Sequence, residues 1–587
     1  MRVCWWCVLL FAVMAGPIVA AQPEADAAEG PPRFNGTPVY VSGSGGERIG
    51  GTSAVPTDVP PPSVSVSGVT PEDIAAGVFD PGDTLEMLMA WRYTHQTNTA
   101  VFGLWERGGY ETVDVRFLLR AGVGGLGGAV ALLPTQGFGE SGPIDALPEG
   151  FSWDEPNLPG ALAVAFDTHN PPSGNWFNAM GNIYDRPQRE VSLHFDGVEI
   201  ANVLSDVDFA VGIEGEEDED EGFHAVHLRV EHATGGGYVT VLIDEQAVIG
   251  RRFVAGLMPY EHRLGFGASS SDFAAPFDIR AIAYEVGSPA RERAEPTRAM
   301  LIDKAVVHAG NREPMSQAAL PEIDPAQTGR IIATLTLDPG PGGCDPWDKK
   351  GAVYIFDAAG ERFELLRFIT PYGRPYEWKI DVTDYATLLS GDIAAGLFVD
   401  TWMSGETPET TPGWTISVAL DFYPGTPERE VVAIENLWTG EPEYGNPAAP
   451  MQAFFEDKTL TLPEGATGGF VRLMVTGHGM HPATYNAGEF MPADRTLVVN
   501  RTERHGDLLW REDCYLNPCR PQGGTWKFDR AGWAPGAMVL PWEIGLGEAF
   551  AEGREATLGY VPMAYENLAR DQAQATHWVE SQVFYTR

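Results

Sequence analysis

The 587-residue chain is short of basic residues and of cysteine, and these shortages exclude several classes of protein. Lysine and arginine together number 39 against 81 aspartates and glutamates, which leaves a formal net charge of −42. A chain this acidic repels nucleic acid and anionic lipid, and no basic patch stands out that would override the repulsion. We therefore expect no nucleic-acid partner, and a soluble protein of a saline or extracellular setting.

Cysteine is scarce, and its spacing excludes a zinc site. Of the five cysteines, two lie near the start of the chain, and the others are Cys344, Cys514 and Cys519. Cys4 and Cys7 lie in the apolar run expected to leave as a signal peptide, and the three cysteines that remain do not form the two ligand pairs of a zinc site. Cys514 and Cys519 bracket the segment CYLNPC, and a disulfide between them can close this small loop in an oxidising compartment. Cys344 is then left without a partner.

Long apolar runs are absent except at the N-terminus, where VCWWCVLLFAVMAGPIVA follows Arg2. A transmembrane helix needs about 20 clean apolar residues with an anchoring flank, whereas this run is short, contains a Gly-Pro step and leads into acidic residues. A positive start, a short apolar core and the small residues Val19, Ala20 and Ala21 instead predict a secretory signal peptide over residues 1–21. We therefore expect a secreted or periplasmic protein without a membrane span.

The rest of the chain is dominated by strand-type patterns. Residues 22–74 are rich in Gly, Ser and Pro, which indicates a flexible leader. Residues 75–287 contain short alternating apolar runs between turn signals, such as REVSLHFDG and GYVTVLID, which predict a β-sandwich. A charged, Pro-bearing linker follows at 288–299. Strand patterns then resume over 300–426 and 427–587, and WTISVALDFY alternates apolar with polar residues in the period of a strand that buries one face.

Two further patterns have an ordinary structural explanation. The run EGEEDEDE at 214–221 lacks the alternating ligand and glycine order of a calcium loop, so we expect a solvated surface loop. The stretch from Gly122 to Gly127 spells the GxGxxG of dinucleotide sites, but the next residues, GAVALLPTQGFG, are too short and Pro-ended for the helix that such a site requires. Neither pattern predicts a ligand.

The segments GALAVAFDTHNPPSGNWFNAMGNIYDRPQREVSLHFDG and HRLGFGASSSDFAAPFDIRAIAYEV resemble the central and closing strands of L-type (legume-type) lectins. The resemblance covers residues 75–287 and implies a concanavalin-like β-sandwich. It implies a calcium ligand at Asp167, with Asn170 and Asp185 as further candidates, because hard oxygen ligands on one irregular loop suit Ca2+. Gly127 stands where the family has its sugar-binding Asp, so sugar binding and a spacer or docking role both stay open.

The last part of the chain resembles the peptide-N-glycosidase F family, amidases that remove N-linked glycans from asparagine. The resemblance rests on ordered motifs that include CDPWDKKGAVYIF, LLRFITPYGRPYEWKIDVTDYATLLSG, LFVDTWMSG, VTGHGMHPATYNAGEF and GGTWKFDRAGWAPG. It implies two eight-stranded antiparallel jelly rolls, over 300–426 and 427–587. The fold class expected for the whole chain is therefore all-β, a concanavalin-like β-sandwich followed by two jelly rolls.

The same resemblance assigns the residues of the site. The catalytic positions are Asp348, Glu489 and Asp400, and the substrate-binding positions are Trp402, Arg530, Trp347 and His478. Asp348 falls on the family's primary catalytic aspartate and Glu489 on its second essential carboxylate. Asp400 stands in place of a glutamate, and the missing methylene withdraws its carboxylate by roughly 1.5 Å. The cysteines that bracket the second carboxylate in the family are absent from this chain.

Carboxylates suit the reaction that the resemblance implies. Hydrolysis of an Asn–sugar amide needs a nucleophilic water and a protonated leaving glycosylamine, and a positioned carboxylate can serve either need. Converging acids repel one another, so at least one can hold a proton near neutral pH. We assign Asp348 as general base or acid at the scissile amide, Glu489 to the water and Asp400 to sugar hydroxyls. Trp402 would offer an apolar face to the sugar, and Arg530 would offset the acids or hold the amide carbonyl.

The expected partners are N-glycosylated proteins or glycopeptides, bound by a monomer that needs no cofactor for catalysis. One alternative is a copper enzyme, because copper-dependent monooxygenases share the double jelly-roll scaffold and His478, Met480 and His481 are suitable ligands. A pair of copper sites would need further matched histidines. A second alternative is a secreted glycan-binding protein whose amidase site has lapsed, which the change at Asp400 favours.

Overall fold

The computed structural model describes residues 97–587 apart from 123–125, 142–143, 145–150, 169–188, 212–221, 271–274, 482–487, 512, 515–516, 552 and 573. Before residue 97 it describes the short strands β1 (Pro38–Ser44), β2 (Glu47–Arg48), β3 (Ser65–Val66), β4 (Leu85–Leu88) and β5 (Tyr93–Thr94). The predicted signal peptide at 1–21 lies outside these residues. In the part of the chain that is described, no helix is long and apolar enough to cross a membrane.

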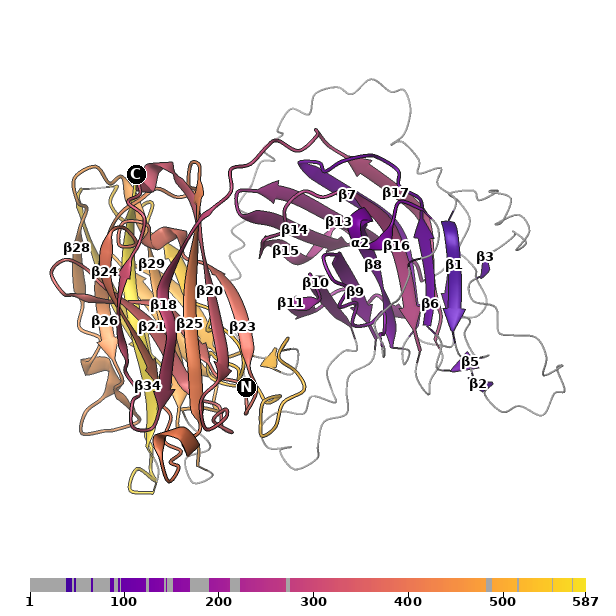
Figure 1. Cartoon of the computed structure of the whole chain (residues 1–587). Helices are drawn as coiled ribbons and strands as arrows, with labels where there is room; N and C mark the ends of the chain where they lie inside the picture. Colours follow the sequence, from indigo (N-terminus) through magenta and orange to yellow (C-terminus); the bar gives the residue numbers. More distant parts are fainter. Residues whose placement is uncertain are drawn as a thin grey trace, which may run out of the picture.

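An N-terminal module, β1 to β17, is built from two facing sheets and is drawn in indigo to magenta in Figure 1. One sheet has the order β1-β6-β16-β8-β9-β10-β11, and the other has the order β15-β14-β13-β7-β17-β4-β3, with β12 beside β7. Its remaining strands are β6 (Thr97–Phe102), β7 (Thr112–Gly122), β8 (Gly127–Pro134), β9 (Leu162–Asp167), β10 (Glu190–Phe195), β11 (Val198–Leu204), β12 (Ala210–Val211), β13 (His224–Ala233), β14 (Gly236–Ile243), β15 (Gln246–Ala255), β16 (His262–Ser269) and β17 (Phe277–Val286). The rings of Phe117, Phe166 and Phe266 are buried in the core and meet edge to face. The predicted β-sandwich is thus present.

The C-terminal module, β18 to β34, begins with a jelly roll of two four-stranded antiparallel sheets. Their orders are β18-β25-β20-β23 and β19-β24-β21-β22. The strands are β18 (Thr297–His308), β19 (Met315–Ala319), β20 (Thr328–Pro339), β21 (Lys350–Phe356), β22 (Arg362–Ile369), β23 (Tyr376–Asp381), β24 (Asp392–Val399) and β25 (Gly413–Pro424). The period-two alternation of β25 buries Ile416, Val418 and Leu420 in the core, as the sequence predicts.

The second jelly roll has a core of its own and packs against the first, to whose core it contributes Val431, Phe470 and Phe584. Its sheets have the orders β26-β34-β29-β32, with β27 beside β34, and β28-β33-β30-β31. The strands are β26 (Val431–Gly440), β27 (Glu443–Tyr444), β28 (Lys458–Thr461), β29 (Gly468–His478), β30 (Ala493–Val499), β31 (Glu503–Leu509), β32 (Trp542–Gly545), β33 (Glu555–Pro562) and β34 (Ala575–Thr586). The rings of Phe470 and Phe584 stack within the core of the first roll, 4.8 Å apart. Because β27 is added, the described part of this roll has one strand more than the predicted eight.

Helical turns are short throughout the described residues, which confirms the all-β fold class. They are α2 (Thr135–Phe138), η3 (Pro325–Gln327), η4 (Thr383–Tyr385), η5 (Pro408–Thr410) and η6 (Met451–Ala453). In Figure 1 the C-terminal module, in magenta, orange and yellow, lies beside the N-terminal module, with β23 on the side nearest to it.

Two of the predicted boundaries need correction. The segment 22–74 was expected as a flexible leader, but its residues Pro38–Ser44 form β1 and pair antiparallel with β6, and shorter pieces form β2 and β3. The Gly and Ser content of this segment hides the short run of strand-prone Val and Tyr residues in PVYV. The linker predicted over 288–299 ends earlier, because β18 begins at Thr297 and pairs with Phe422 of β25. Other residues of 22–74 lie outside the described part of the chain.

Candidate active site between the jelly rolls

Asp348 sits in a turn that is held by buried hydrogen bonds just before β21. The side chain of Asp345, which is fully buried, accepts hydrogen bonds from the backbone N–H of Trp347 at 3.0 Å and from the hydroxyl of Thr401 at 2.6 Å. The N–H of Lys349 donates to Thr370 Oγ1 across 2.9 Å. An aspartate that accepts from the backbone two residues on is a typical turn former. Of the two aspartates in CDPWDKK, Asp345 therefore shapes the turn, and Asp348 is left to face the pocket.

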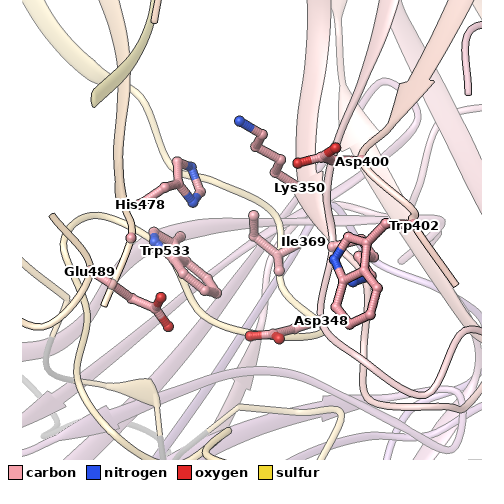
Figure 2. Close-up of a pocket in the computed structure, with 10 residues that line it drawn as sticks. Asp348, Lys350, Ile369, Asp400, Trp402, His478, Glu489 and Trp533 are labelled. Atoms are coloured by element: carbon pink, nitrogen blue, oxygen red, sulfur yellow. The ribbon is translucent and has the colours of Figure 1, made fainter. Parts of the chain in front are cut away.

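A pocket of about 280 Å³ gathers residues from both jelly rolls. It is lined by Asp348, Lys349, Lys350, Ile369, Asp400, Trp402, His478, Gly479, Glu489 and Trp533. Figure 2 shows the carboxylates of Asp348 and Glu489 pointing toward one another at one side of this space, with His478 and Asp400 farther along it. The structure thus brings together all three predicted acids, which are separated by as much as 141 residues in sequence (489 − 348).

Arg530 lies between the two carboxylates and is fully buried. Its Nε donates to Glu489 Oε1 at 3.2 Å, and its Nη2 lies 3.9 Å from Asp348 Oδ2. Two further donations fix the guanidinium, one from Nη1 to the carbonyl oxygen of Phe528 at 2.7 Å and one from Nη2 to Thr525 Oγ1 at 2.6 Å. A buried guanidinium held in this way keeps two acids from different jelly rolls in one geometry.

The surroundings of the two acids favour retention of a proton. Burial raises the pKa of Glu489 to about 7, with Arg530 acting in the opposite direction and the charge of Asp348 adding to the rise. Burial also raises the pKa of Asp348, against the lowering effects of Arg530 and of a hydrogen bond from Tyr372. Two carboxylates beside one guanidinium carry a net negative charge when both ionise, so the ionised form of Asp348 favours the protonated form of Glu489.

Two exposed tryptophans, Trp347 in the turn that carries Asp348 and Trp402 after β24, stack beside the pocket. The rings of Trp347 and Trp402 stack with centroids 6.3 Å apart and planes 27° apart, and the side chains are 47% and 55% exposed. The ammonium of Lys349 lies over the Trp402 ring, with its Nζ 3.7 Å from the ring centroid. Exposed aromatic pairs of this kind present a flat apolar surface that water solvates poorly. Trp402 lines the pocket, and Trp347 extends the surface from it.

Asp400 is placed less tightly than the other two acids. It follows β24, its side chain is 39% exposed, and its Oδ1 accepts from Arg312 Nη1 at 3.2 Å. Arg312 carries no signal in the sequence that would single it out, because it lies far from every matched motif. Asp400 therefore lies at the open side of the pocket, paired with a surface arginine, and away from the Arg530 pair.

His478 forms a wall of the pocket in a neutral state. Its Nε2 is 2.8 Å from Thr476 Oγ1, and its ring stacks on Trp533 at 5.4 Å. Burial lowers the pKa of His478 well below its usual value. Trp533 lines the same pocket and donates from Nε1 to the carbonyl oxygen of Gly477 at 2.7 Å. The motif DRAGWAPG contains Trp533, and this matched motif is the signal that could have singled the residue out.

Cys514 and Cys519 are both buried and both have free thiols, so the disulfide expected between them is not formed. Cys514 packs in a small apolar cluster with Ala534 and Ala537, and its Sγ lies 3.4 Å from the carbonyl oxygen of Trp533. Asn517, between the cysteines, donates from its side chain to the carbonyl oxygen of Pro535 and accepts from the N–H of Cys519 at 2.9 Å. These hydrogen bonds hold the loop that the disulfide was expected to close.

The calcium ligands predicted in the N-terminal module are only partly described. Asp167 ends β9 and is paired across the sheet with Glu190 of β10 and with Gly127 of β8. Asn170 and Asp185 lie outside the described residues. Within the described ranges, no three His, Cys, Asp or Glu side chains gather as a metal site of these residue types would require.

Comparison with known proteins gives matches for both modules. Residues 449–584 match the family model described as peptide-N-glycosidase F, C terminal. The chain is 31% identical over 215 residues to peptide-N(4)-(N-acetyl-beta-D-glucosaminyl)asparagine amidase F of Elizabethkingia miricola, a match that covers 34% of this chain and 58% of that protein. The chain therefore spans less than two thirds of the length of this relative.

Among solved structures, PNGase F, a glycosylasparaginase from Flavobacterium meningosepticum, aligns with a TM-score of 0.44 at 23% identity, covering 50% of this chain and 96% of that one. The exoplasmic/lumenal domain of VIP36, solved in a Ca2+/Man3GlcNAc-bound form, aligns with a TM-score of 0.23 at 13% identity, covering 34% of this chain and 77% of that one. The relation of the C-terminal part to a family rests on the two sequence matches and not on these structural alignments. The C-terminal part of the chain is therefore related to peptide-N-glycosidase F, which confirms the resemblance predicted from its motifs.

Proposed function

We propose that the protein is an amidase that hydrolyses the bond between asparagine and the first sugar of N-linked glycans, acting on glycoproteins or glycopeptides. The observation that carries this proposal is the convergence of Asp348 and Glu489, from different jelly rolls, on the buried guanidinium of Arg530. The relation of the C-terminal part to peptide-N-glycosidase F supports the substrate class.

The reaction needs only water and groups of this site. Water adds to the side-chain carbonyl carbon of the glycosylated asparagine while a carboxylate removes its proton. The carbon–nitrogen bond then breaks, and the nitrogen leaves as a glycosylamine after it takes up a proton. In the proposed division of roles, Asp348 transfers the proton at the scissile amide, and ionised Glu489 orients the water by accepting a hydrogen bond. Arg530 offsets the charge that accumulates between them.

The sugar would lie toward the tryptophans and Asp400. Trp402 offers its apolar face at the pocket, and Trp347 continues that surface outward. The carboxylate of Asp400, at the open side, can accept hydrogen bonds from sugar hydroxyls even while Arg312 contacts one of its oxygens. His478, neutral and hydrogen-bonded to Thr476, would close the opposite wall.

The proposal is tested by incubating the purified protein with a denatured N-glycopeptide and following free glycan by mass spectrometry. We expect release by the unaltered protein and none by Asp348→Asn, with the variant still retaining the glycopeptide on an affinity column. Retention without release by the unaltered protein would overturn the amidase proposal. It would favour the alternative function, a glycan-binding protein, which the replacement of glutamate by Asp400 also favours.

The proposal also includes export of the protein and action as a monomer. Export through the predicted signal at 1–21, to the periplasm or outside the cell, would bring the protein to glycoproteins in such compartments. Action as a monomer is consistent with a pocket formed within one chain. Calcium binding at Asp167 stays a prediction, because its other expected ligands lie outside the described residues.

A further inference from the structure

Arg520, in the C-terminal module, reaches into a cluster of acids on the N-terminal module. Its Nη2 donates to Glu155 Oε1 and, at 2.9 Å, to Glu190 Oε1, while its Nη1 lies 3.4 Å from Glu199 Oε1. Asn202 donates from its side-chain nitrogen to both Glu190 and Glu199, at 2.6 Å in the latter case. One guanidinium is thus surrounded by three carboxylates of the other module.

This contact is built into the sheet and is not a chance meeting of surface charges. Glu190 lies on β10 and Glu199 on β11, and their side chains are only 4% and 5% exposed, while that of Arg520 is 16% exposed. Carboxylates buried to this degree are costly unless a cation pairs with them. The N-terminal module therefore carries a cluster of acids, two of them buried, whose cationic partner is a residue of the C-terminal module.

A second contact fixes the modules at another point. Arg330 of β20 donates from Nη2 to the hydroxyl of Tyr238 on β14 at 3.0 Å, and its guanidinium lies 4.0 Å from the ring centroid of Phe253 on β15. Tyr238 also donates to Glu428 of the C-terminal module. Two separate contacts determine an orientation, whereas one would leave the modules free to pivot. The N-terminal module is therefore docked and does not simply hang from the linker.

The segment that carries Arg520 also forms the support of the candidate active site. In this segment, Gln522 Oε1 accepts from the backbone N–H of Tyr372 at 3.1 Å. Thr525 Oγ1 lies 3.0 Å from the Tyr372 hydroxyl and accepts from Arg530 Nη2 at 2.6 Å. Gly524 has φ +66°, and a Cβ there would lie 2.5 Å from the Tyr372 ring. The segment is thus packed closely on Tyr372 and hydrogen-bonded to Arg530.

Both of these supported residues act on Asp348. Tyr372 hydrogen-bonds to the Asp348 carboxylate and lowers its pKa, and Arg530 lies 3.9 Å from it. Arg374 adds a further restraint on the segment, because its Nη1 donates to the carbonyl oxygen of Pro521, the residue after Arg520, at 2.7 Å. A continuous series of contacts therefore leads from the acids of the N-terminal module to Asp348.

We propose that Arg520 is a positioning residue through which the docked N-terminal module fixes the segment 517–525, and with it Tyr372 and Arg530, against Asp348. The inference rests on the proposed amidase function for its kinetic part only. On this account the N-terminal module is a structural part of the active site's support, in addition to any ligand that it binds. A misplacement of about 1 Å at reacting groups can cost on the order of a hundredfold in rate.

The test compares Arg520→Ala, Arg520→Lys and the control Tyr238→Phe in the full chain. Tyr238→Phe removes one hydroxyl from the second contact, where Arg330 still packs on the ring of Phe253, and it touches nothing in the segment 517–525. We expect Arg520→Ala to lower kcat by about 10- to 100-fold with KM changed by less than about threefold, since the tryptophan surface is untouched. We expect Arg520→Lys to restore part of the loss, and Tyr238→Phe to stay within about twofold of the unaltered protein.

Amide hydrogen exchange provides a readout that does not depend on activity. We expect faster exchange in the segment 517–525 of Arg520→Ala than of Tyr238→Phe, and Glu190→Gln, which keeps a hydrogen-bonding group, should show a smaller change of the same sign. Unchanged kcat and unchanged exchange in Arg520→Ala would overturn the inference. A protein without amidase activity whose segment still exchanges faster in Arg520→Ala would overturn the proposed function and support the docking.

Discussion

Glu489 accepts a hydrogen bond from Nε of the fully buried Arg530 at 3.2 Å. The same guanidinium lies 3.9 Å from Asp348, which belongs to the other jelly roll. This arrangement makes the boundary between the rolls a functional feature, because neither roll alone holds both acids. It also gives the two acids a common electrostatic partner.

The pH dependence of kcat/KM should show the ionisation of Glu489. Because burial raises the pKa of Glu489 to about 7, the carboxyl is protonated below this pH and ionised above it. A water-orienting role needs the ionised form, so kcat/KM should rise with pH through about 7. Glu489→Gln should lower the rate and remove this inflection. A rate that falls with rising pH through this range would contradict the assigned role.

Replacing Arg530 should destabilise the protein as well as inactivate it. Arg530→Met removes a fully buried cation and leaves the partly buried carboxylates of Glu489 and Asp348 without it, which should cost about 3 kcal/mol of unfolding free energy at neutral pH. Chemical denaturation measures this change. The matched control is Arg312→Met, which removes the arginine of the exposed pair with Asp400 and should cost less than about 1 kcal/mol. Equal effects of the two changes would contradict the described burial.

Removing the aromatic surface should weaken binding more than turnover. Trp402→Ala takes away the exposed ring that lines the pocket, and we expect KM to rise about tenfold, or about 1.4 kcal/mol, with kcat changed much less. Trp402→Phe keeps a ring and should restore most of the loss. Steady-state kinetics on a glycopeptide series would check this, and a fall in kcat at constant KM would show that Trp402 acts elsewhere in the reaction.

Lengthening Asp400 should improve the site. Asp400→Glu adds one methylene and extends the carboxylate by roughly 1.5 Å, and glutamate is the residue that the motif resemblance implies at this position. We expect kcat/KM to rise by about threefold to tenfold, since hydrogen bonds to charged groups contribute about 1.5–3 kcal/mol at best. Asp400→Asn should lower it. If both variants behave like the unaltered protein, the Asp400 side chain does not contact the sugar.

The sequence predicted the all-β class and the acids of the pocket because both are recorded in local patterns. Alternating residues such as Ile416 and Val418 reveal buried strands, and matched motifs place Asp348 and Glu489. The disulfide prediction failed because sequence proximity of Cys514 and Cys519 does not show which way their side chains face.

The sequence alone did not predict the contacts between segments that are distant along the chain. Arg520 and Glu190 are separated by 330 residues, and nothing in either local pattern indicates that they meet. Arg312 and Trp533 were missed for different reasons: the first lies outside every matched motif, and the second lies within the motif DRAGWAPG, in which the resemblance assigns a role to Arg530 alone. Long-range pairing depends on how the modules pack, which only the folded structure shows.

The most direct test of the central claim is hydrolysis of an N-glycopeptide in heavy-oxygen water. The account predicts that the former asparagine becomes an aspartate carrying one heavy oxygen, because the carbon–nitrogen bond of the amide breaks and water supplies the new oxygen. Asp348→Asn should give no labelled aspartate. A labelled sugar with an unlabelled, unchanged asparagine would show cleavage within the glycan, and that result would contradict the account.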